Sequence, residues 1–316
     1  MVILNFCSCI DVENIPIGEA DPIRSDEYYE NLRAWKSTFK EREIMFGWYG
    51  NFSGKPSANM ATSLKALPDS VDLISLWGGG TDIEDAVKYI QEVKGTKVTF
   101  TIFSHDLPSG LGGDTLNIWS DREVLDNAIR LHAQGLVKSM KERGLDGIDL
   151  DNESKANNLY YHPENFGLLL SELSKSVGPE SGTGKLLMVD GYINLIPDTC
   201  LSMVDYCIVQ SYGYYNDEMF QRAYNIIKDN APPSKLILTE NFENYASTGG
   251  SAYYTDSEGN SMPSFEGMAR WTPKEGRKGG VGLFHIEYDY KNAPGYYYTN
   301  NAIRIMNSKT YDGNEN

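Results

Sequence analysis

Hydrophobic residues recur along the chain in short runs that are rich in β-branched and aromatic side chains. Eight of these runs have the length of a buried strand and are bounded by polar or turn-forming residues. They lie at residues 44–49, 71–77, 97–103, 147–151, 185–190, 206–212, 236–240 and 280–284. The pattern therefore predicts eight strands spread over most of the chain.

Segments with apolar residues at helical spacing lie between these runs. In residues 82–90, for example, Ile83, Val87 and Ile90 fall three or four positions apart, and Gly144 ends another such segment as a C-cap. Further helices are predicted at residues 25–39, 123–143, 165–177 and 217–228. Strands that alternate with helices indicate parallel β-α units, and eight units predict an α/β fold of the (β/α)8 TIM-barrel type. An open doubly wound sheet is the second interpretation, although no G-x-G-x-x-G follows the first strand.

The barrel is expected to fill most of the chain. Residues 1–40 are predicted to be an N-terminal segment that packs on a barrel of residues 41–310, with a tail at 311–316. Long loops rich in Gly, Ser, Asn or Tyr are predicted at residues 104–120, 242–268 and 287–300. Loops that follow barrel strands gather at the C-terminal face, where active sites of this fold lie.

The chain is strongly acidic, with a formal net charge of -16 from 28 Lys and Arg against 44 Asp and Glu. Such a charge repels nucleic acids and anionic membranes, whereas a neutral ligand such as a sugar is accommodated; solubility alone also explains the acidity. No run of about 18 apolar residues predicts a membrane-spanning helix. The four cysteines do not form a disulfide framework, and Cys200 and Cys207 are expected to be buried thiols.

Residues 2–10 are largely apolar and contain Cys7 and Cys9. They look like the end of a lipoprotein signal peptide, although the basic start and the longer apolar core of such a signal are missing. An ordinary N-terminal segment is the alternative. The lipoprotein interpretation predicts an extracytoplasmic protein, which is secreted, periplasmic or held at the cell surface.

The fourth predicted strand carries three acidic residues on one face. Side chains alternate across a strand, so Asp149, Asp151 and Glu153 point one way and the apolar Ile148 and Leu150 point the other. In a barrel the apolar face packs on the helices, and the three acids therefore point inward. Burial and mutual repulsion raise the pKa of at least one carboxyl in such a row. Glu153, nearest the mouth, is expected to be a general acid, with Asp151 as its charged partner and Asp149 sharing a proton with Asp151.

Other interpretations of this segment are weaker. A solvated acidic strand conflicts with the apolar surroundings, and a calcium loop would lack the glycine and distal glutamate of an EF-hand. No H-E-x-x-H motif or Cys/His cluster is present, and we expect neither a metal nor any other cofactor. No G-x-S-x-G motif indicates a serine hydrolase. Asp146 has the opposite parity and is expected to be structural, although it is also a candidate substrate contact, and Gly147 allows close packing.

Residues 146–153, Asp-Gly-Ile-Asp-Leu-Asp-Asn-Glu, resemble the D-x-x-D-x-D-x-E signature of glycoside hydrolase family 18. That family includes chitinases and endo-β-N-acetylglucosaminidases, and the resemblance extends over residues 40–300 as strand order and spacing. Gln210-Ser211-Tyr212 looks like the Gln-x-Tyr of the endo-β-N-acetylglucosaminidase branch, where chitinases more often have Met-x-Tyr. The resemblance implies an oligosaccharide or an N-glycoprotein as the substrate and cleavage within the N-glycan core.

The family mechanism, carried over residue by residue, is substrate-assisted and retaining. Glu153 would protonate the glycosidic oxygen while the 2-acetamido carbonyl of the substrate attacks the anomeric carbon. Asp151 would orient the acetamide and stabilise the oxazolinium intermediate, and Asp149 would tune Asp151. Tyr212 would hydrogen-bond the acetamide oxygen, and Gln210 would position the sugar. Glu153 would then activate water.

One feature departs from the family pattern, because residues 279–285 lack the tryptophan that usually floors the −1 sugar on the eighth strand. Phe284 or His285 is expected to replace it. The other candidate substrate contacts are Trp48, Trp77, His105, Asp190, Glu240 and Asn241. Two alternatives stay open: a chitinase-type hydrolase of GlcNAc polymers, and a non-catalytic glycan-binding protein, which in this family typically lacks the glutamate present here as Glu153.

Overall fold

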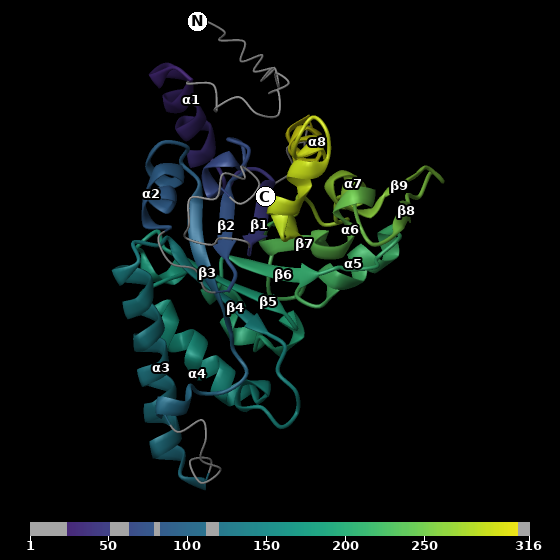
Figure 1. Ribbon diagram of the computed structural model, residues 1–316. Helices are drawn as coiled ribbons and strands as arrows, with labels where there is room; N and C mark the ends of the chain where they lie inside the picture. Colours follow the sequence, from purple (N-terminus) through teal and green to yellow (C-terminus); the bar gives the residue numbers. More distant parts are fainter. Residues whose placement is uncertain (1–23, 51–62, 79–82, 112–119, 309–316) are drawn as a thin grey trace, which may run out of the picture.

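The protein forms a closed barrel of eight parallel strands (Figure 1). The computed structural model describes residues 24–50, 63–78, 83–111 and 120–308. Around the barrel the strands follow the order β1-β10-β7-β6-β5-β4-β3-β2. Their bounds are β1 Ile44–Tyr49, β2 Leu73–Leu76, β3 Lys97–Phe103, β4 Gly147–Asn152, β5 Leu186–Gly191, β6 Tyr206–Gln210, β7 Leu236–Asn241 and β10 Gly280–Phe284. The predicted (β/α)8 barrel is confirmed, with each predicted run ending within two residues of a strand.

Helices cover the outside of the barrel and agree with most of the sequence predictions. Their bounds are α1 Asp26–Ser37, α2 Glu84–Glu92, α3 Arg122–Glu142, α4 Pro163–Ser174, α5 Asp217–Asn225, α6 Phe242–Tyr245, α7 Ser264–Arg270 and α8 Tyr297–Ser308. Gly144 follows α3 with φ 64°, as a C-terminal glycine should. The connection between β5 and β6 holds only 3-10 turns instead of an α-helix.

Two of the three predicted loops contain regular structure. Residues 242–268 include α6, α7 and an antiparallel hairpin of β8 (Tyr253–Thr255) and β9 (Ser261–Pro263), and α8 begins inside residues 287–300. The hairpin projects from the edge of the molecule beyond α5 and α7 (Figure 1). Most of these elements are too short to show a helical or strand period, and their sequences contain many Gly, Ser and Tyr residues.

Alternate residues of the strands separate an inner core from an outer one. The inner cluster contains Ile44, Phe46, Trp48, Leu73, Leu186, Met188, Tyr206, Ile208 and Ile237. The larger outer cluster lies between the sheet and the helices, and it includes Ile148 and Leu150 of β4. This alternation fixes which acidic side chains of β4 point into the barrel.

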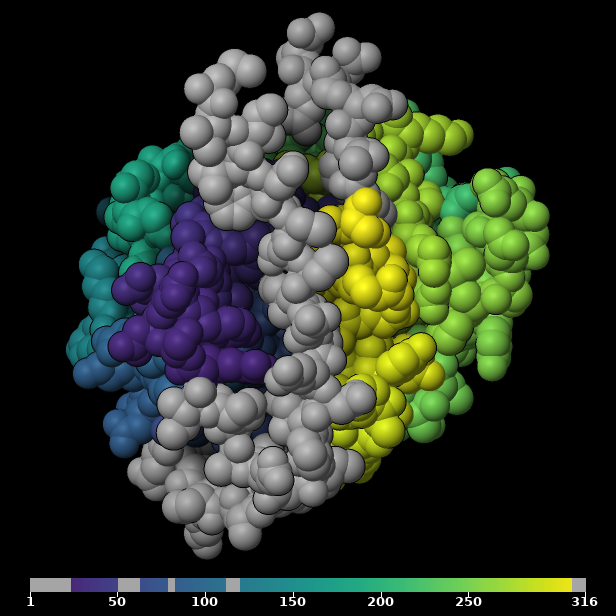
Figure 2. All heavy atoms as spheres, turned by 90° about the horizontal axis from the view of Figure 1, so that it is seen from above, coloured from purple at the N-terminus to yellow at the C-terminus, as the bar shows by residue number. Residues whose placement is uncertain are grey.

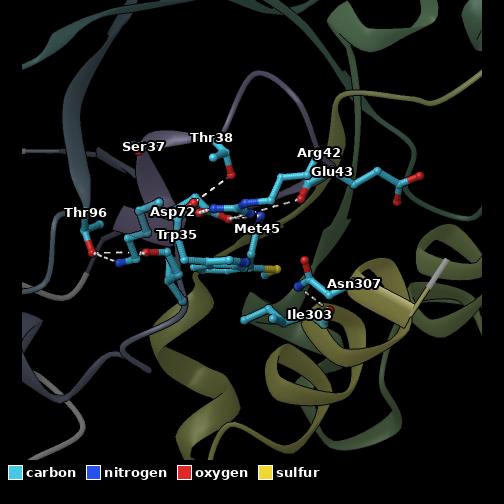
Figure 3. A network of polar contacts seen from close by, with 12 residues as sticks. Trp35, Ser37, Thr38, Arg42, Glu43, Met45, Asp72, Thr96, Ile303 and Asn307 are labelled. Atoms are coloured by element: carbon cyan, nitrogen blue, oxygen red, sulfur yellow. Dashed lines mark hydrogen bonds and ion pairs between the residues drawn. The ribbon is translucent and has the colours of Figure 1, made fainter. Parts of the chain in front are cut away.

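Helix α1 packs at the N-terminal end of the barrel. Lys36 donates to the backbone oxygen of Val71 and to the hydroxyl of Thr96, both at 2.7 Å. Arg42 lies 3.6 Å from the centre of the Trp35 ring and is paired with Asp72, just before β2 (Figure 3). Residues at the starts of β1, β2 and β3 are thereby tied to one helix at the N-terminal end of the barrel.

The first and last helices of the described chain lie on one face. Viewed from above, the purple N-terminal segment and the yellow α8 are both on the face toward the viewer (Figure 2). Ile303 and Asn307 of α8 lie near Trp35 and Met45 (Figure 3). The first and last helices therefore both support β1.

Residues 1–23 lie outside the described ranges, and so do Cys7, Cys9 and the apolar segment 2–10. The lipoprotein and extracytoplasmic interpretations therefore stay predictions. The predicted boundaries at residues 40 and 310 stay predictions as well. Within the described ranges, none of the helices combines the length and the apolar character that a bilayer crossing needs. Cys200 and Cys207 are buried free thiols, as expected.

A buried ion pair joins Lys278, just before β10, to Glu43, just before β1. The two side chains are fully buried, with 2.7 Å between Nζ and Oε2, and Lys278 also donates to the backbone oxygen of Trp271. Replacement of Lys278 breaks this ion pair while the Glu43 carboxylate stays buried. We expect Lys278→Met to lower the free energy of unfolding by about 3–5 kcal/mol, measured by urea denaturation.

The matched control is Lys138→Met, because Lys138 pairs with Glu142 at 3.8 Å while 75% and 65% of the two side chains are exposed. A surface pair of this kind contributes about 1 kcal/mol or less. Equal losses in the two variants would show that burial of the Lys278 pair carries no special weight.

Candidate active site

The acidic residues of β4 lie inside the barrel in the predicted row. Asp149 and Asp151 are buried, and Glu153, just beyond the strand, is partly exposed at the mouth. Gly191 at the end of β5 has φ 82°, and a Cβ there would meet the Glu153 side chain at 3.1 Å and the Asn152 backbone at 2.9 Å. Glycine at this position leaves room for Glu153 at the C-terminal mouth.

Asp149, the deepest member of the row, is held by neighbours on both sides. Its Oδ2 accepts hydrogen bonds from the indole nitrogen of Trp48 and the hydroxyl of Thr101, each at 2.9 Å. Thr101 in turn lies 2.7 Å from the hydroxyl of Ser75. Donors from β1 and β3 therefore stabilise negative charge on this side of the Asp149 carboxyl.

A fourth inward carboxyl comes from the neighbouring strand β5. Asp190 is the register partner of Asp151 and is 1% exposed. Its Oδ1 accepts a hydrogen bond of 3.0 Å from the amide nitrogen of Gln210 on β6. Four carboxyls from two adjacent strands thus cluster inside the barrel, with Asp151 and Asp190 at the same level.

Burial and proximity perturb the acidity of this cluster. Burial, together with the charges of Glu153 and Asp149, raises the pKa of Asp151 to about 7. Burial also raises the pKa of Asp149, against the hydrogen bonds from Trp48 and Thr101. The pKa of Asp190 is raised well above its ordinary value by burial and by the charges of Asp149 and Asp151. The cluster therefore holds protons at neutral pH, as the row of acids predicts.

A cavity of about 210 Å³ opens above the cluster. It is lined by Trp48, Trp77, Phe103, Asp151, Glu153, Asp190, Gln210, Tyr212 and Phe284. The aromatic rings form one wall: the centre of the Trp77 ring lies 5.1 Å from that of Phe284 and 6.1 Å from that of Phe103. Flat apolar rings beside carboxyls are typical of sites that hold a sugar ring over reacting groups.

Tyr212, which follows β6 by two residues, also lines the cavity. Burial raises its pKa further above the ordinary range, and the charges of Asp190 and Glu240 act in the same direction. The phenol therefore stays protonated and can donate a hydrogen bond into the cavity.

Asp146 lies at the other end of the barrel from the cavity. Its carboxylate accepts from the side chain of Gln91 and from the backbone N–H of Val98, and it pairs with Lys185 at 3.4 Å. These contacts join the N-terminal ends of neighbouring strands, so Asp146 is structural and the substrate contact proposed for it from sequence is corrected. A Cβ at Gly147 would come 2.3 Å from the backbone oxygen of Leu186, which confirms the close packing expected there.

Glu240 faces away from the cavity because its parity on β7 directs it toward the helices. Its carboxylate accepts hydrogen bonds from the hydroxyls of Ser264 at 2.5 Å and Ser251 at 2.8 Å. It therefore anchors the segment that carries the β8–β9 hairpin, which corrects its assignment as a substrate contact. The neighbouring Asn241 caps α6 by accepting from the backbone of Asn244.

Two histidines lie behind the aromatic wall and do not line the cavity. His105 packs beside Phe103, with 5.9 Å between ring centres. His285 has a left-handed backbone with φ 58°, and its Nδ1 lies 2.6 Å from the carboxylate of the buried Glu287. The two rings pack against Phe103 and Phe284, and the substrate contact expected of His105 and His285 stays a prediction.

Sequence reasoning missed three residues of the site. Phe103 lines the cavity with 56% of its surface exposed, and Thr101 and Ser75 complete the polar contacts of Asp149. Strand parity identifies all three residues. Thr101 and Phe103 point inward along β3 just as Asp149 and Asp151 do along β4, and Ser75 shares the inward parity of Leu73 on β2. Within the described ranges, no group of three or more His, Cys, Asp or Glu residues has an arrangement that could hold a metal ion.

Comparisons with known proteins agree with this geometry. Residues 7–305 match the family model described as glycoside hydrolase family 18, BT1044-like. The chain is 28% identical to endo-beta-N-acetylglucosaminidase F2 of Elizabethkingia meningoseptica, over 88% of this chain and 85% of that protein.

Two solved structures resemble the whole barrel. A structure of BT1044 is 27% identical with a TM-score of 0.75, and the alignment covers 93% of this chain and 98% of that one. The endo-beta-N-acetylglucosaminidase of Cordyceps militaris in apo form is 20% identical with a TM-score of 0.69, over 90% of this chain and 97% of that one. The second likeness concerns the fold alone.

Proposed function

This chain belongs to glycoside hydrolase family 18, as a BT1044-like glycosidase, and we propose that it cleaves the β-1,4 bond between the two core GlcNAc residues of N-glycans. The observation that carries the proposal is the cavity in which Glu153, Asp151 and Tyr212 converge beside Gln210. The relative of Elizabethkingia meningoseptica bears the name of an endo-beta-N-acetylglucosaminidase, which supports the same substrate class.

In the first half of the reaction Glu153 donates its proton to the glycosidic oxygen. Its place at the open mouth of the cavity puts it next to a bond that enters from solvent. The acetamido oxygen of the −1 sugar attacks the anomeric carbon as the bond to the leaving group breaks, and a cyclic oxazolinium ion forms. The electron pair of the broken bond goes to the leaving oxygen, which takes the proton from Glu153.

Asp151 and Tyr212 hydrogen-bond the acetamide group of the −1 sugar from the cavity lining. The Asp151 carboxylate accepts the acetamide N–H and stabilises the positive charge that develops on the ring. The protonated phenol of Tyr212 donates to the acetamide oxygen and directs it toward the anomeric carbon. In the second half the Glu153 carboxylate removes a proton from water, which attacks the same carbon, and retention results.

Gln210 favours the N-glycan substrate over a chitin polymer. The residue lies in the cavity and its amide is fixed by Asp190, so one polar group faces the sugar at a position where the chitinase pattern has an apolar methionine. A non-catalytic binding protein is disfavoured because Glu153, which such members lack, occupies the mouth of the cavity.

An assay with two substrates tests the proposal. The protein is incubated with a high-mannose glycoprotein and with a chitin oligomer, and released glycans are identified by mass spectrometry. Release of a glycan that has one GlcNAc at its reducing end, from the glycoprotein alone, supports the proposal. Cleavage of the chitin oligomer alone would instead establish a chitinase, and binding without turnover of either substrate would indicate a glycan-binding protein.

Phe284 replaces the usual tryptophan and is expected to carry sugar stacking. Its ring packs edge-on against Trp77 in the cavity wall. Loss of one stacking ring costs about 1–3 kcal/mol of binding, so Phe284→Ala should raise KM about 10- to 100-fold. The measurement is a steady-state titration with the glycopeptide substrate. The control is Tyr297→Ala, an exposed aromatic on α8 outside the cavity lining, and a Phe284→Ala variant with unchanged KM would rule out stacking.

A further inference from the structure

The cluster contains more carboxyl oxygens than donors. Within the described part of the chain, no N–H or O–H group reaches Asp149 Oδ1, Asp151 Oδ1 or Asp190 Oδ2, although all three atoms are buried. The Asp190 carboxyl lies within hydrogen-bonding reach of the carboxyls of both Asp149 and Asp151. Buried oxygens that face one another in this way are satisfied only when a proton lies between them.

The remaining contacts identify which carboxyl keeps that proton. Oδ2 of Asp149 already accepts from Trp48 and Thr101, an arrangement that stabilises an anion. Asp190 has one donor, the Gln210 amide, and that donor contacts a single oxygen. Asp190 is also only 1% exposed, and it has two negative neighbours on β4, Asp149 and Asp151. The neutral form is therefore favoured at Asp190 over Asp149.

We propose that Asp190 is a positioning residue that stays protonated through the reaction. Its single O–H is shared, as a three-centre hydrogen bond, between the facing oxygens of Asp149 and Asp151, while its other oxygen fixes Gln210. The inference rests on the proposed function, in which Asp151 accepts the acetamide N–H and Gln210 contacts the sugar. The O–H of Asp190 keeps Asp151 ionised and turned toward the acetamide. The carbonyl-type oxygen of Asp190 takes the Gln210 N–H, so the Gln210 oxygen is presented to the sugar.

The groups that face Asp190 are few. Asp149, Asp151 and Glu153 approach from β4, and Gln210 and Tyr212 approach from β6. Burial raises the pKa of Asp190 well above its ordinary value, and the charges of Asp149 and Asp151 raise it further. Because Tyr212 also stays protonated, the charge beside Asp190 changes only through the carboxyls of β4.

Asparagine tests this assignment because it copies the neutral acid: its oxygen can accept from Gln210, and its N–H can donate to β4. Asp190→Asn should keep kcat within about threefold of the wild type, whereas Asp190→Ala should lose about 10- to 100-fold in kcat. If Asp190 were ionised, asparagine would remove the functional charge, and Asp190→Asn should lose as much kcat as Asp190→Ala. Equal losses in the two variants would overturn the proposal.

The pH profile of kcat/KM should shift in a direction that a purely structural role of Asp190 does not predict. If Asp190 donates to Asp151, then Asp190→Ala raises the pKa of Asp151 and moves the acidic limb up by about half a pH unit or more, while Asp190→Asn leaves it in place. If Asp190 is an anion, both variants remove a neighbouring negative charge and move the limb down. A downward shift in Asp190→Asn would therefore refute the proposal.

Infrared difference spectroscopy makes the test independent of turnover. At neutral pH the wild type minus Asp190→Asn spectrum should show the carbonyl band of a protonated carboxylic acid. The same difference for Asp198→Asn, an exposed aspartate outside the cavity, should show a carboxylate band. Loss of a carboxylate band in both variants would overturn the protonated state. Failure of the wild type to cleave either substrate would instead count against the proposed function and leave the spectra to be judged alone.

Discussion

Replacement of Glu153 by Gln should lower kcat by about 10²- to 10⁴-fold while KM changes little. Glutamine fills the same space at the mouth of the cavity but has no proton to give to the leaving oxygen and no carboxylate to activate water. The substrate contacts made by Trp77, Phe284 and Tyr212 stay in place. The measurement is steady-state kinetics on the glycopeptide, with isothermal titration calorimetry to follow binding.

The matched control is Glu164→Gln, which alters an exposed glutamate in the first turn of α4. Its kcat should equal that of the wild type, because the side chain lies outside the cavity lining. Substrates with an activated leaving group add a second check, since they need less protonation and should recover part of the lost rate. A Glu153→Gln enzyme as active as Glu164→Gln would refute the general-acid assignment.

Replacement of Asp151 by Asn should lower kcat/KM by about 10²-fold or more at neutral pH and remove the acidic limb of the pH profile. In the wild type the carboxyl acts as an anion, and its pKa is raised to about 7 by burial and by Glu153 and Asp149. The rate of the wild type should therefore fall as pH drops through about 7, because protonation of Asp151 removes the charge that stabilises the oxazolinium ion. Asparagine does not titrate, so its lower rate should be flat there.

Thermal unfolding distinguishes this effect from damage to the fold. An acid whose pKa is higher in the folded protein than in the unfolded chain stabilises the fold only while it is protonated, and that contribution is lost as pH rises through the folded pKa. The Tm of Asp151→Asn should therefore rise relative to that of the wild type as pH increases from the ordinary range of an aspartate to about 7, and the difference should level off above pH 7. A variant that is both inactive and less stable at high pH would count against a functional anion at this position.

The barrel and its acidic row could be predicted because they rest on local alternation. Ile148 and Leu150 are apolar where Asp149 and Asp151 are not, so one rule assigns the two faces of β4 and places three acids inside. The same rule, applied to β3, would have placed Thr101 and Phe103 in the site. Neither residue is charged, however, so the sequence of β3 alone does not mark its inward face as part of a site.

The rest of the site depends on contacts between segments that are distant in sequence. Glu240 ends a strand at the mouth, and only the structure shows that Ser251 and Ser264 bind its carboxylate on the helix side. His285 follows Phe284 directly, but its left-handed backbone turns it toward Glu287 and away from the cavity. Neither turn geometry nor hydroxyl partners can be inferred from the order of apolar and polar residues.

The closure of the barrel has a consequence for how the protein is made. β1 pairs with β2 on one edge and with β10 on the other, and β10 is the last barrel strand to be synthesised. One edge of β1, which carries Trp48, therefore stays unpaired on the ribosome until nearly the whole chain has emerged. Such long-range pairing slows folding and exposes a strand edge to other chains. Completion of the site around Asp149 should thus be a late event, and nascent chains that stop before residue 280 should depend on chaperones for their solubility.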